Sequence, residues 1–281
     1  MNRLQNILDK AERDGMIHRV RLDRGAPVLV PPDSSGAPTG RPEDSTDRIE
    51  STRAPAAMAV PEPAPIQVVT GARLDGHFVG ISSNGATAEQ YRALRTRILH
   101  TDSVSAVNVL LVTSPGRAEG KTLTAGNLAL TMAQEYQRQI CLVEADLRHP
   151  CLQRLFGLPD RPGLADVLAG EATLDDALMV LDEHRITVLP AGTVPARPAE
   201  LLGTKAMRRV IETLRARFDR VVVDAPAAGP LADVRILTPL VDSVLLVVRS
   251  ALTSKPSIRD AVSALDRGKL IGMLLNDADA A

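Results

Sequence analysis

The sequence has few aromatic residues. Phe, Trp and Tyr make up 2% of the 281 residues, and Trp is absent. Proteins that hold single-stranded nucleic acid usually stack bases on aromatic side chains and carry positive charge. The formal net charge here is −1. The composition therefore argues against a nucleic-acid-binding protein.

Cysteines and long apolar runs are also scarce. Cys141 and Cys151 stand in no paired spacing and near no histidine cluster, so we expect neither a disulfide framework nor a zinc site. No stretch approaches the ~20 apolar residues that a membrane-spanning helix requires. The first residues, MNRLQNILDKAERDG, are charged and amphipathic, unlike a signal peptide. We expect a cytoplasmic protein.

Proline is unevenly distributed along the chain. Residues 27–65 hold nine of the 20 prolines, many small or charged residues and no aromatic residue. Such a composition predicts a disordered linker. Residues 1–26 begin with an amphipathic helical pattern, which is either a docking helix or a frayed terminus. Together these segments form a disordered N-terminal extension ahead of a folded domain over residues 66–281.

The most informative stretch is residues 107–127, VNVLLVTSPGRAEGKTLTAGN. A nearly all-apolar run, typical of a parallel strand buried on both faces, leads through a glycine-bearing turn into a helical pattern. This context predicts a phosphate-binding P-loop, in which Lys121 reaches the β and γ phosphates and the Thr122 hydroxyl ligates Mg²⁺. The usual first glycine of the motif is Pro115, so the loop is not standard in every torsion. An ordinary strand-to-helix turn is the alternative. The residues expected to contact a nucleotide are Pro115, Gly116, Arg117, Ala118, Glu119, Gly120, Lys121, Thr122 and Leu123.

Carboxylates follow two further apolar strands. The strand over residues 139–143 ends in Glu144 and Asp146, whose side chains project from the same side, where open α/β sheets bind ligands. They can hold hydrated Mg²⁺ or accept a proton. The strand over residues 220–223 leads into Asp224, which can hold a metal-bound water. Helix caps or surface acids are the alternatives.

Strand and helix patterns alternate along the rest of the chain. Apolar strands are expected at 186–189, 244–248 and 270–275, and helices at 86–99, 198–218 and 256–267. This alternation predicts an α/β fold with a doubly wound, mostly parallel sheet. On the helix over residues 86–99, Glu89, Arg92 and Arg95 line one stripe, and spacing alone favours a solvated charged face.

Taken together, these motifs resemble the bacterial tyrosine kinases of capsule and exopolysaccharide systems. The likeness covers residues 80–279, through VTSPGRAEGKTLTAGNLAL, VEADLRHPCLQRLFGL, LPAGTVPARPAELL, VVVDAPAAGPLADVRIL and LIGMLLNDAD. It implies ATP and Mg²⁺ as cofactors. Lys121, Glu144, Asp146 and Asp224 would be the catalytic residues, Thr122, Asp146 and Asp224 the metal ligands, and Asn276 an adenine contact or simply a turn residue. The family usually has Asp-x-Asp where this chain has Glu144 and Asp146.

The resemblance also implies assembly. The family's Glu-x-x-Arg-x-x-Arg oligomerisation motif falls on Glu89, Arg92 and Arg95, which makes a ring of subunits the expectation. The implied activator is a transmembrane polysaccharide chain-length regulator, or co-polymerase, that recruits the protein to the inner membrane.

The family's C-terminal tyrosine cluster has no counterpart here, where the tyrosines are Tyr91 and Tyr136. Two hypotheses follow. The first is a Mg-ATP-dependent tyrosine kinase whose acceptor tyrosines and activating element lie on another polypeptide. The second is a nucleotide-switched ATPase or interaction module without tyrosine phosphotransfer. Positioning ATPases of the ParA and MinD type share the expected fold, but typically carry a second lysine near the place of Gly116 and Arg117.

Overall fold

The computed structural model describes residues 66–81, 85–102, 108–135, 138–229 and 232–277. The helix expected within residues 1–26, the linker over residues 27–65 and Tyr136 lie outside these ranges. In the described part of the chain, none of the helices is long and apolar enough to cross a bilayer.

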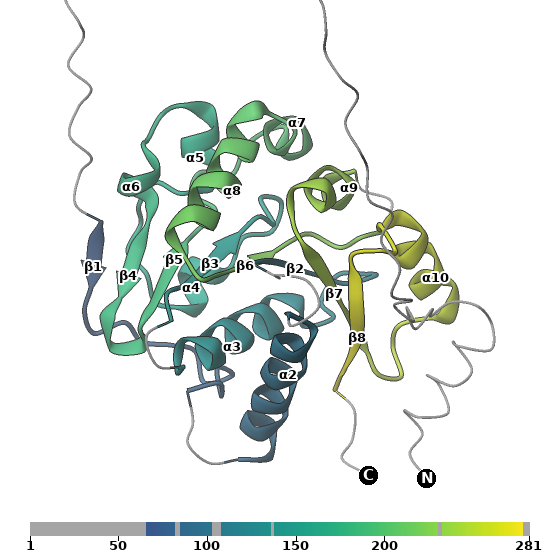
Figure 1. The fold of residues 1–281 in the computed structure, drawn as a ribbon. Coiled ribbons are helices and arrows are strands. Elements are labelled where there is room, and N and C mark those ends of the chain that lie inside the picture. Colours follow the sequence, from purple (N-terminus) through teal and green to yellow (C-terminus); the bar gives the residue numbers. More distant parts are fainter. Residues whose placement is uncertain (1–65, 82–84, 103–107, 136–137, 230–231, 278–281) are drawn as a thin grey trace, which may run out of the picture. The chain divides into compact units, whose positions relative to one another are not determined.

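The fold is built on an eight-stranded sheet with the order β1-β4-β5-β3-β6-β2-β7-β8 (Figure 1). All neighbouring strands are parallel except β4 and β5, which are antiparallel. The predicted mostly parallel sheet is therefore confirmed. The strands are β1 (Gln67–Val69), β2 (Val109–Thr113), β3 (Ile140–Glu144), β4 (Met179–Leu181), β5 (Ile186–Leu189), β6 (Arg220–Asp224), β7 (Ser243–Arg249) and β8 (Leu270–Asn276).

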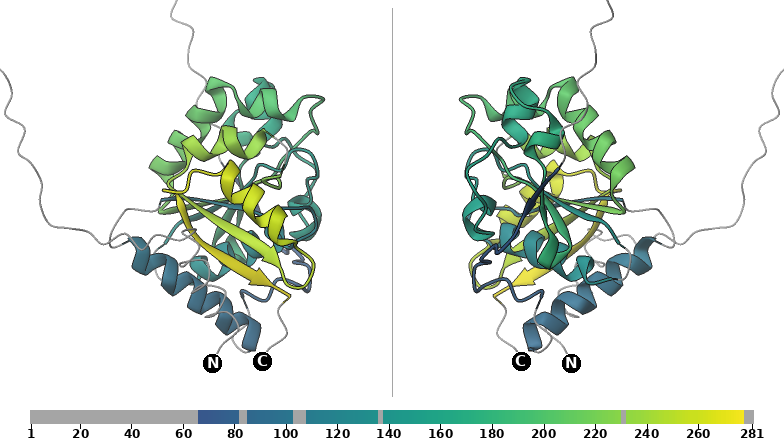
Figure 2. Two further views of the ribbon diagram at one scale, coloured as in Figure 1. Left: turned by 90° about the vertical axis from the view of Figure 1, so that its right-hand side faces the viewer. Right: turned by 90° about the vertical axis from the view of Figure 1, so that its left-hand side faces the viewer.

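Helices cover both faces of the sheet, as a doubly wound fold requires. Helices α3 and α4 cover one face, and α5, α7, α8, α9 and α10 cover the other. Helix α2 packs on α3 and projects from that side of the sheet, as both views of Figure 2 show. The helices are α2 (Ala86–Asp102), α3 (Lys121–Ala133), α4 (Leu152–Leu155), α5 (Leu164–Ala169), α6 (Leu174–Ala177), α7 (Pro198–Leu202), α8 (Lys205–Arg217), α9 (Asp233–Leu237) and α10 (Lys255–Ala264), with 3₁₀ turns η1 (Asp182–His184) and η2 (Thr238–Leu240).

Strand β2 shows why its apolar run predicted burial on both faces. Val109 and Leu111 pack into the core under α5 to α10, whereas Leu110 and Val112 pack into the core under α3. Successive side chains of a strand point to opposite faces. A strand with helices on both sides therefore needs apolar residues at every position.

The structure corrects the predicted helix over residues 198–218, which is two helices. Helix α7 ends at Leu202, and α8 begins after Thr204, whose hydroxyl accepts a hydrogen bond from the Met207 N–H at 3.4 Å. A threonine at this position satisfies an N–H that has no partner within the helix, and so it favours a new helix start. The strands β1 and β4 were not predicted, because three residues are too few to show a periodic pattern.

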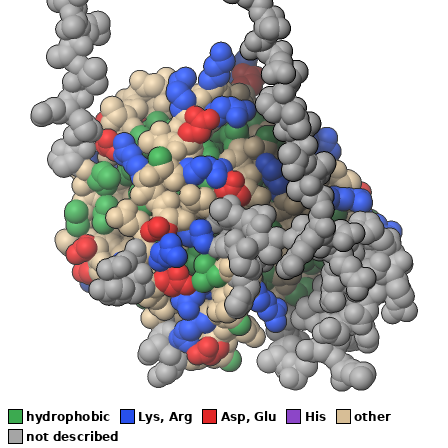
Figure 3. Space-filling model, in the orientation of Figure 1, with side chains coloured by type: hydrophobic (Ala, Val, Ile, Leu, Met, Phe, Trp, Pro, Cys, Tyr) green, Lys and Arg blue, Asp and Glu red, His purple; other side chains and the backbone are tan. Residues whose placement is uncertain are grey.

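Charged side chains are mixed by sign over the outer surface. On the face seen in Figure 3, Lys and Arg side chains are interspersed with Asp and Glu side chains among the described residues. This distribution agrees with the formal net charge of −1.

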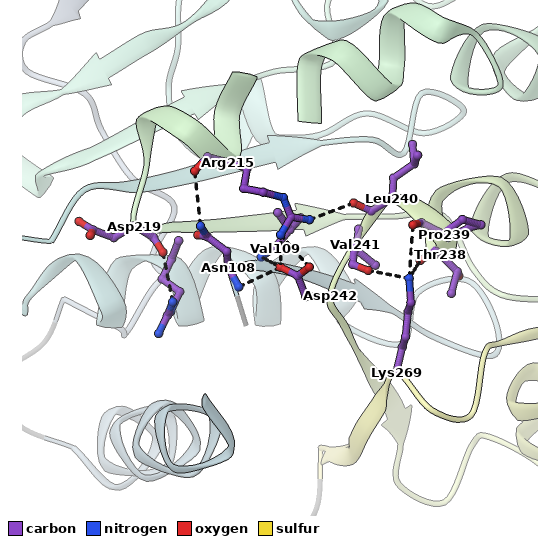
Figure 4. Close-up of polar contacts among 11 residues, drawn as sticks. Asn108, Val109, Arg215, Asp219, Thr238, Pro239, Leu240, Val241, Asp242 and Lys269 are labelled. Atoms are coloured by element: carbon purple, nitrogen blue, oxygen red, sulfur yellow. Dashed lines mark hydrogen bonds and ion pairs between the residues drawn. The ribbon is translucent and has the colours of Figure 1, made fainter. Parts of the chain in front are cut away.

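The amino end of β2 is held by a carboxylate on the strand beside it. Asp242, just before β7, accepts hydrogen bonds from the Asn108 N–H at 2.9 Å and the Val109 N–H at 2.8 Å. The Arg215 guanidinium of α8 approaches both oxygens of Asp242, at 2.7 and 2.6 Å (Figure 4). Nearby, the Lys269 ammonium donates to three backbone carbonyls at the end of η2. These contacts fix the amino end of β2, and the P-loop leaves from the opposite end of the same strand.

We expect Asp242→Ala to lower the free energy of unfolding by about 2–3 kcal/mol, because two backbone N–H groups and a guanidinium lose their shared acceptor. Urea unfolding of the purified protein measures this loss. Asp260→Ala, an exposed acid on α10, is the control and should change stability by no more than about 0.5 kcal/mol. Equal effects of the two substitutions would contradict the anchoring role of Asp242.

Candidate active site

The predicted site residues meet at the carboxyl edge of three neighbouring strands. Strand β6 lies between β3 and β2, and Asp224 is in register with both Glu144 and Val112. The loop between β2 and α3 leaves from the same edge. Open α/β sheets bind their ligands at this edge.

The loop from Ser114 to Gly120 folds tightly against the start of α3. Ala118 and Gly120 adopt left-handed backbone conformations, with φ of 57° and 91°. A φ of 91° favours glycine at position 120, and a Cβ there would also displace the Asn276 side chain, whose Nδ2 atom lies 2.1 Å from its place. The first turn of α3 has neither a side-chain cap nor an acidic residue. Its backbone N–H groups and helix dipole therefore suit a bound anion.

Lys121 pairs with one of the predicted carboxylates. Its Nζ lies 2.8 Å from the Asp146 Oδ2, and both side chains are largely buried. Burial alone would lower the pKa of Lys121, but the negative charges of Asp224 and Asp146 outweigh it and raise the pKa. The ammonium therefore stays charged and can move from Asp146 to an incoming phosphate.

Asp224 is buried without a hydrogen-bond partner. Its side chain is 0% exposed, and neither of its oxygens receives a hydrogen bond of ordinary geometry. Burial raises the pKa of Asp224 to about 7, a shift that Lys121 and Thr122 oppose and that Glu144 and Asp146 increase. A buried carboxylate in this state needs a cation, a water or a proton.

These oxygens fit a hydrated Mg²⁺ ion. Thr122, Asp146 and Asp224 offer hydroxyl and carboxylate oxygens, the donors that Mg²⁺ prefers. Two carboxylates and a hydroxyl match the way Mg²⁺ is usually bound, with waters and substrate phosphates completing its coordination. No cluster of three or more His, Cys, Asp or Glu that could hold a metal occurs among the described residues.

Glu144 makes contacts that differ from those of Asp146 and Asp224. One of its oxygens accepts hydrogen bonds from the N–H groups of Cys151 and Leu152, the latter at 2.7 Å, and the other accepts from Ala191 N–H at 3.1 Å. Burial raises the pKa of Glu144, although these donors oppose the shift. Because three amides occupy its oxygens, the geometry favours a role in holding two loops over the predicted role as proton acceptor.

The outer side of the P-loop is held by residues at or just after the ends of β7 and β8. Asn276 Nδ2 donates to the Glu119 carbonyl at 3.0 Å, and the Thr253 hydroxyl donates to the Glu119 carboxylate at 2.9 Å. Arg249 donates to the Ala118 carbonyl at 3.2 Å. Asn276 thus lies at the loop, while its contact with adenine stays a prediction. Thr253 and Arg249 were not predicted from the sequence, although Arg249 ends an apolar strand and Thr253 lies in the turn after it, so both belong to this edge of the sheet.

The charged residues of α2 divide into two groups. Arg92 pairs with Glu89 on the same helix, and the Glu89 side chain is 69% exposed. Arg95 instead donates to the Thr131 carbonyl of α3 at 2.8 Å and lies 3.4 Å from the Glu135 carboxylate. The three residues therefore do not form one free stripe, because Arg95 is already bound within its own chain.

Comparisons with known proteins point to one family. No family model matches the chain. The tyrosine-protein kinase YwqD of Bacillus subtilis is 32% identical over 209 residues, which cover 73% of this chain and 88% of YwqD. The succinoglycan biosynthesis transport protein ExoP of Rhizobium meliloti is 32% identical over 197 residues, which cover 68% of this chain but 25% of ExoP.

Solved structures agree with the sequence relatives. The kinase domain of the Escherichia coli tyrosine kinase ETK has a TM-score of 0.67 and 29% identity, over 73% of this chain and 82% of that one. The septum site-determining protein MinD of Pyrococcus horikoshii, solved with Mg-ADP, has a TM-score of 0.51 and 24% identity, over 62% of this chain and 72% of MinD. The second likeness shows a shared fold alone.

The buried state of Asp224 predicts a pH-dependent stability. In the nucleotide-free protein the folded state binds this proton more tightly than the unfolded state, so stability falls as pH rises from about 4 to about 7. We expect Asp224→Asn to remove that fall. From about pH 4 to about pH 7, the free energy of unfolding of the variant should therefore rise by up to about 4 kcal/mol relative to that of the parent. The rise is smaller to the extent that Lys121 loses stabilisation when the charge of Asp224 is removed. Urea unfolding at pH 5 and pH 8 measures the difference, with Asp260→Asn as the exposed control. Parallel pH profiles for Asp224→Asn and the parent would contradict the prediction.

Proposed function

This chain belongs to the family of bacterial tyrosine-protein kinases, and we propose that its site transfers the γ-phosphoryl group of Mg-ATP to tyrosine hydroxyls. The observation that carries the proposal is the buried, unpartnered carboxylate of Asp224 beside the Lys121–Asp146 ion pair and the uncapped start of α3. The uncapped helix start and the Lys121 ammonium suit a phosphate, and the carboxylates of Asp146 and Asp224 suit the cation bound to that phosphate.

Each residue has a proposed role. Lys121 and the loop amides bind the phosphates, and Thr122, Asp146 and Asp224 hold hydrated Mg²⁺. When bound, Mg-ATP supplies the phosphoryl group and the cation that neutralises its charge. Positioning and electrostatics provide most of the catalysis in such reactions. Glu144 acts by holding the loop that contains Asp146. The nucleotide-binding residues are Pro115, Gly116, Arg117, Ala118, Glu119, Gly120, Lys121, Thr122, Leu123 and Asn276.

The acceptor tyrosine is proposed to lie on another polypeptide. Tyr91 is the one tyrosine among the described residues, and its phenol interacts with Thr124 and Asn127 of α3. Burial raises the pKa of Tyr91, although these two contacts oppose the shift. A phenol held in this way against the nucleotide-binding helix is not presented to another active site.

A membrane partner and a role in polysaccharide synthesis extend the proposal. ExoP is named for succinoglycan biosynthesis and transport, and a region like this chain makes up 25% of it. We propose that a transmembrane polysaccharide chain-length regulator, or co-polymerase, activates this cytoplasmic chain and recruits it to the inner membrane. The regulator would order the loops around the site and so act by positioning.

The second candidate is an interaction module in which ATP binding controls assembly without phosphotransfer. The half-buried position of Tyr91 on α2 favours it, because this position makes the tyrosine a poor acceptor. The two functions share the nucleotide site, so they differ only in the fate of the γ-phosphate.

We expect Lys121→Met to reduce phosphotransfer by at least about 100-fold, because the variant loses the cation that faces the phosphates. The assay incubates the protein, co-expressed with its neighbouring membrane regulator, with labelled ATP and maps the phosphopeptides. Lys255→Met, an exposed lysine on α10, is the control. Phosphotyrosine in the parent supports the kinase. Nucleotide-dependent complex formation without phosphate incorporation would instead support the module, and failure of the parent to bind Mg-ATP would contradict both functions.

We also propose that the chain forms a homo-oligomer through Glu89 and Arg92 of α2. Reversing the charge with Arg92→Glu should lower the molecular mass measured by light scattering, because contacts between charged groups are lost, and added salt should have the same effect. Arg97→Glu, which makes the same change in charge at an exposed position on another side of α2, should leave the mass unchanged. If Arg92→Glu leaves the mass unaltered at low salt, this face of α2 is a solvated surface and not a contact between subunits.

A further inference from the structure

We propose that the ion pair between Arg148 and Asp233 positions Asp146 for the magnesium ion of the bound nucleotide. This inference rests on the proposed function, and it assigns a role to two residues outside the predicted site. Arg148 and Asp233 are separated by 85 positions in the sequence. The pair therefore forms only when the fold brings the two segments together.

Alternate residues from the last position of β3 onward bind three different segments. Glu144 holds the backbone at the start of α4, Asp146 holds Lys121 of the P-loop, and Arg148 holds Asp233 at the start of α9. Arg148 donates from Nε to Oδ2 at 2.8 Å and from Nη2 to Oδ1 at 3.2 Å. Two parallel hydrogen bonds fix both the distance and the orientation of the guanidinium.

Asp233 is the fixed end of this contact. Its side chain is 0% exposed, and the next residue of α9, Val234, is fully buried in the core together with Leu237. Arg148 is 30% exposed in its side chain and lies in the turn between β3 and α4. The core therefore places Asp233, and Asp233 places Arg148.

Asp146 needs such support when the nucleotide binds. In this structure one of its oxygens contacts Lys121, and the other accepts the His149 N–H at 3.2 Å. In the proposed function, Lys121 leaves Asp146 for the phosphates. The turn is then held on the residue before Asp146 by the hydrogen bond from Ala145 N–H to the Asp224 carbonyl at 2.8 Å. It is held two residues after Asp146 by Arg148. Without Arg148, the turn keeps the contacts of Ala145 and Glu144 but loses its bidentate side-chain contact, the one with α9.

The charge of Arg148 makes the inference testable. Arg148 lies close enough to Asp146 to interact with its charge. Removing a positive charge near a metal site should by itself favour a bound cation. Weaker Mg²⁺ binding after removal of Arg148 would therefore have to come from lost positioning.

The experiment measures the Mg²⁺ dependence of nucleotide binding by the full chain, using a fluorescent ADP analogue. We expect the Mg²⁺ concentration at half-saturation to rise by about 10-fold in Arg148→Met, as for other residues that orient metal ligands. Arg148→Lys, which keeps the charge without the bidentate contact, should be intermediate. Affinity for the analogue in EDTA should change by less than about 2-fold, since the P-loop contacts remain.

A double variant separates positioning from folding stability. Arg148→Met alone leaves the buried Asp233 carboxylate without its cation, so its thermal stability should fall. Arg148→Met with Asp233→Asn removes both charges, and most of the stability should return while Mg²⁺ binding stays weak. Arg215→Met is the matched control, because it breaks a comparable Arg–Asp pair at the opposite end of the strands (Figure 4). It should lower stability and leave the Mg²⁺ dependence unchanged.

Three results would overturn the inference. If the double variant has the Mg²⁺ dependence of the parent, or if Arg215→Met weakens Mg²⁺ binding equally, Arg148 has a structural role only and the proposed function stands. If the parent itself fails to bind the analogue with or without Mg²⁺, the proposed function fails together with this inference.

Discussion

The site depends on one ammonium group among three buried carboxylates. Glu144, Asp146 and Asp224 are 1%, 3% and 0% exposed, and Lys121 is the cation that contacts Asp146 directly and whose charge also acts on Asp224. Three amides compensate Glu144 and Lys121 pairs with Asp146, whereas Asp224 is left with the nearby charge of Lys121 and no hydrogen bond of ordinary geometry. Burying an unpaired charge costs several kcal/mol. In the proposed function, the charge that destabilises the nucleotide-free site is the same charge that favours a metal ion.

The two loops that form the site are fixed from outside it. The P-loop is held on its outer side by Asn276, Thr253 and Arg249, which lie at or just after the ends of β7 and β8. The turn after β3 is held by Glu144 and Arg148. Functional groups act best when surrounding contacts fix their geometry before the ligand arrives. The edge of the sheet and the buried start of α9 therefore provide the frame for the phosphate and metal positions.

Helix α2 joins this frame through its polar residues. Arg95 binds the Thr131 carbonyl of α3, and Tyr91 interacts with Thr124 and Asn127 on the same helix. A change in the position of α2 would thus reach the helix whose first turn holds Lys121 and Thr122. In the proposed oligomer, Glu89 and Arg92 would be the residues of α2 that contact a neighbouring subunit.

The sequence by itself determined the fold class and most of the site. Strands buried on both faces need apolar residues throughout, and the P-loop needs a glycine before Lys121, so β2, the P-loop and the position of Asp224 could be read from local patterns. Only the tertiary structure decided which side chains pair. Glu144 with Ala191, Arg95 with Thr131 and Arg148 with Asp233 each join positions that lie far apart in the chain. Spacing along one element shows which way a side chain points, but its partner depends on the order of the strands and the packing of the helices, and neither leaves a periodic signal in the sequence.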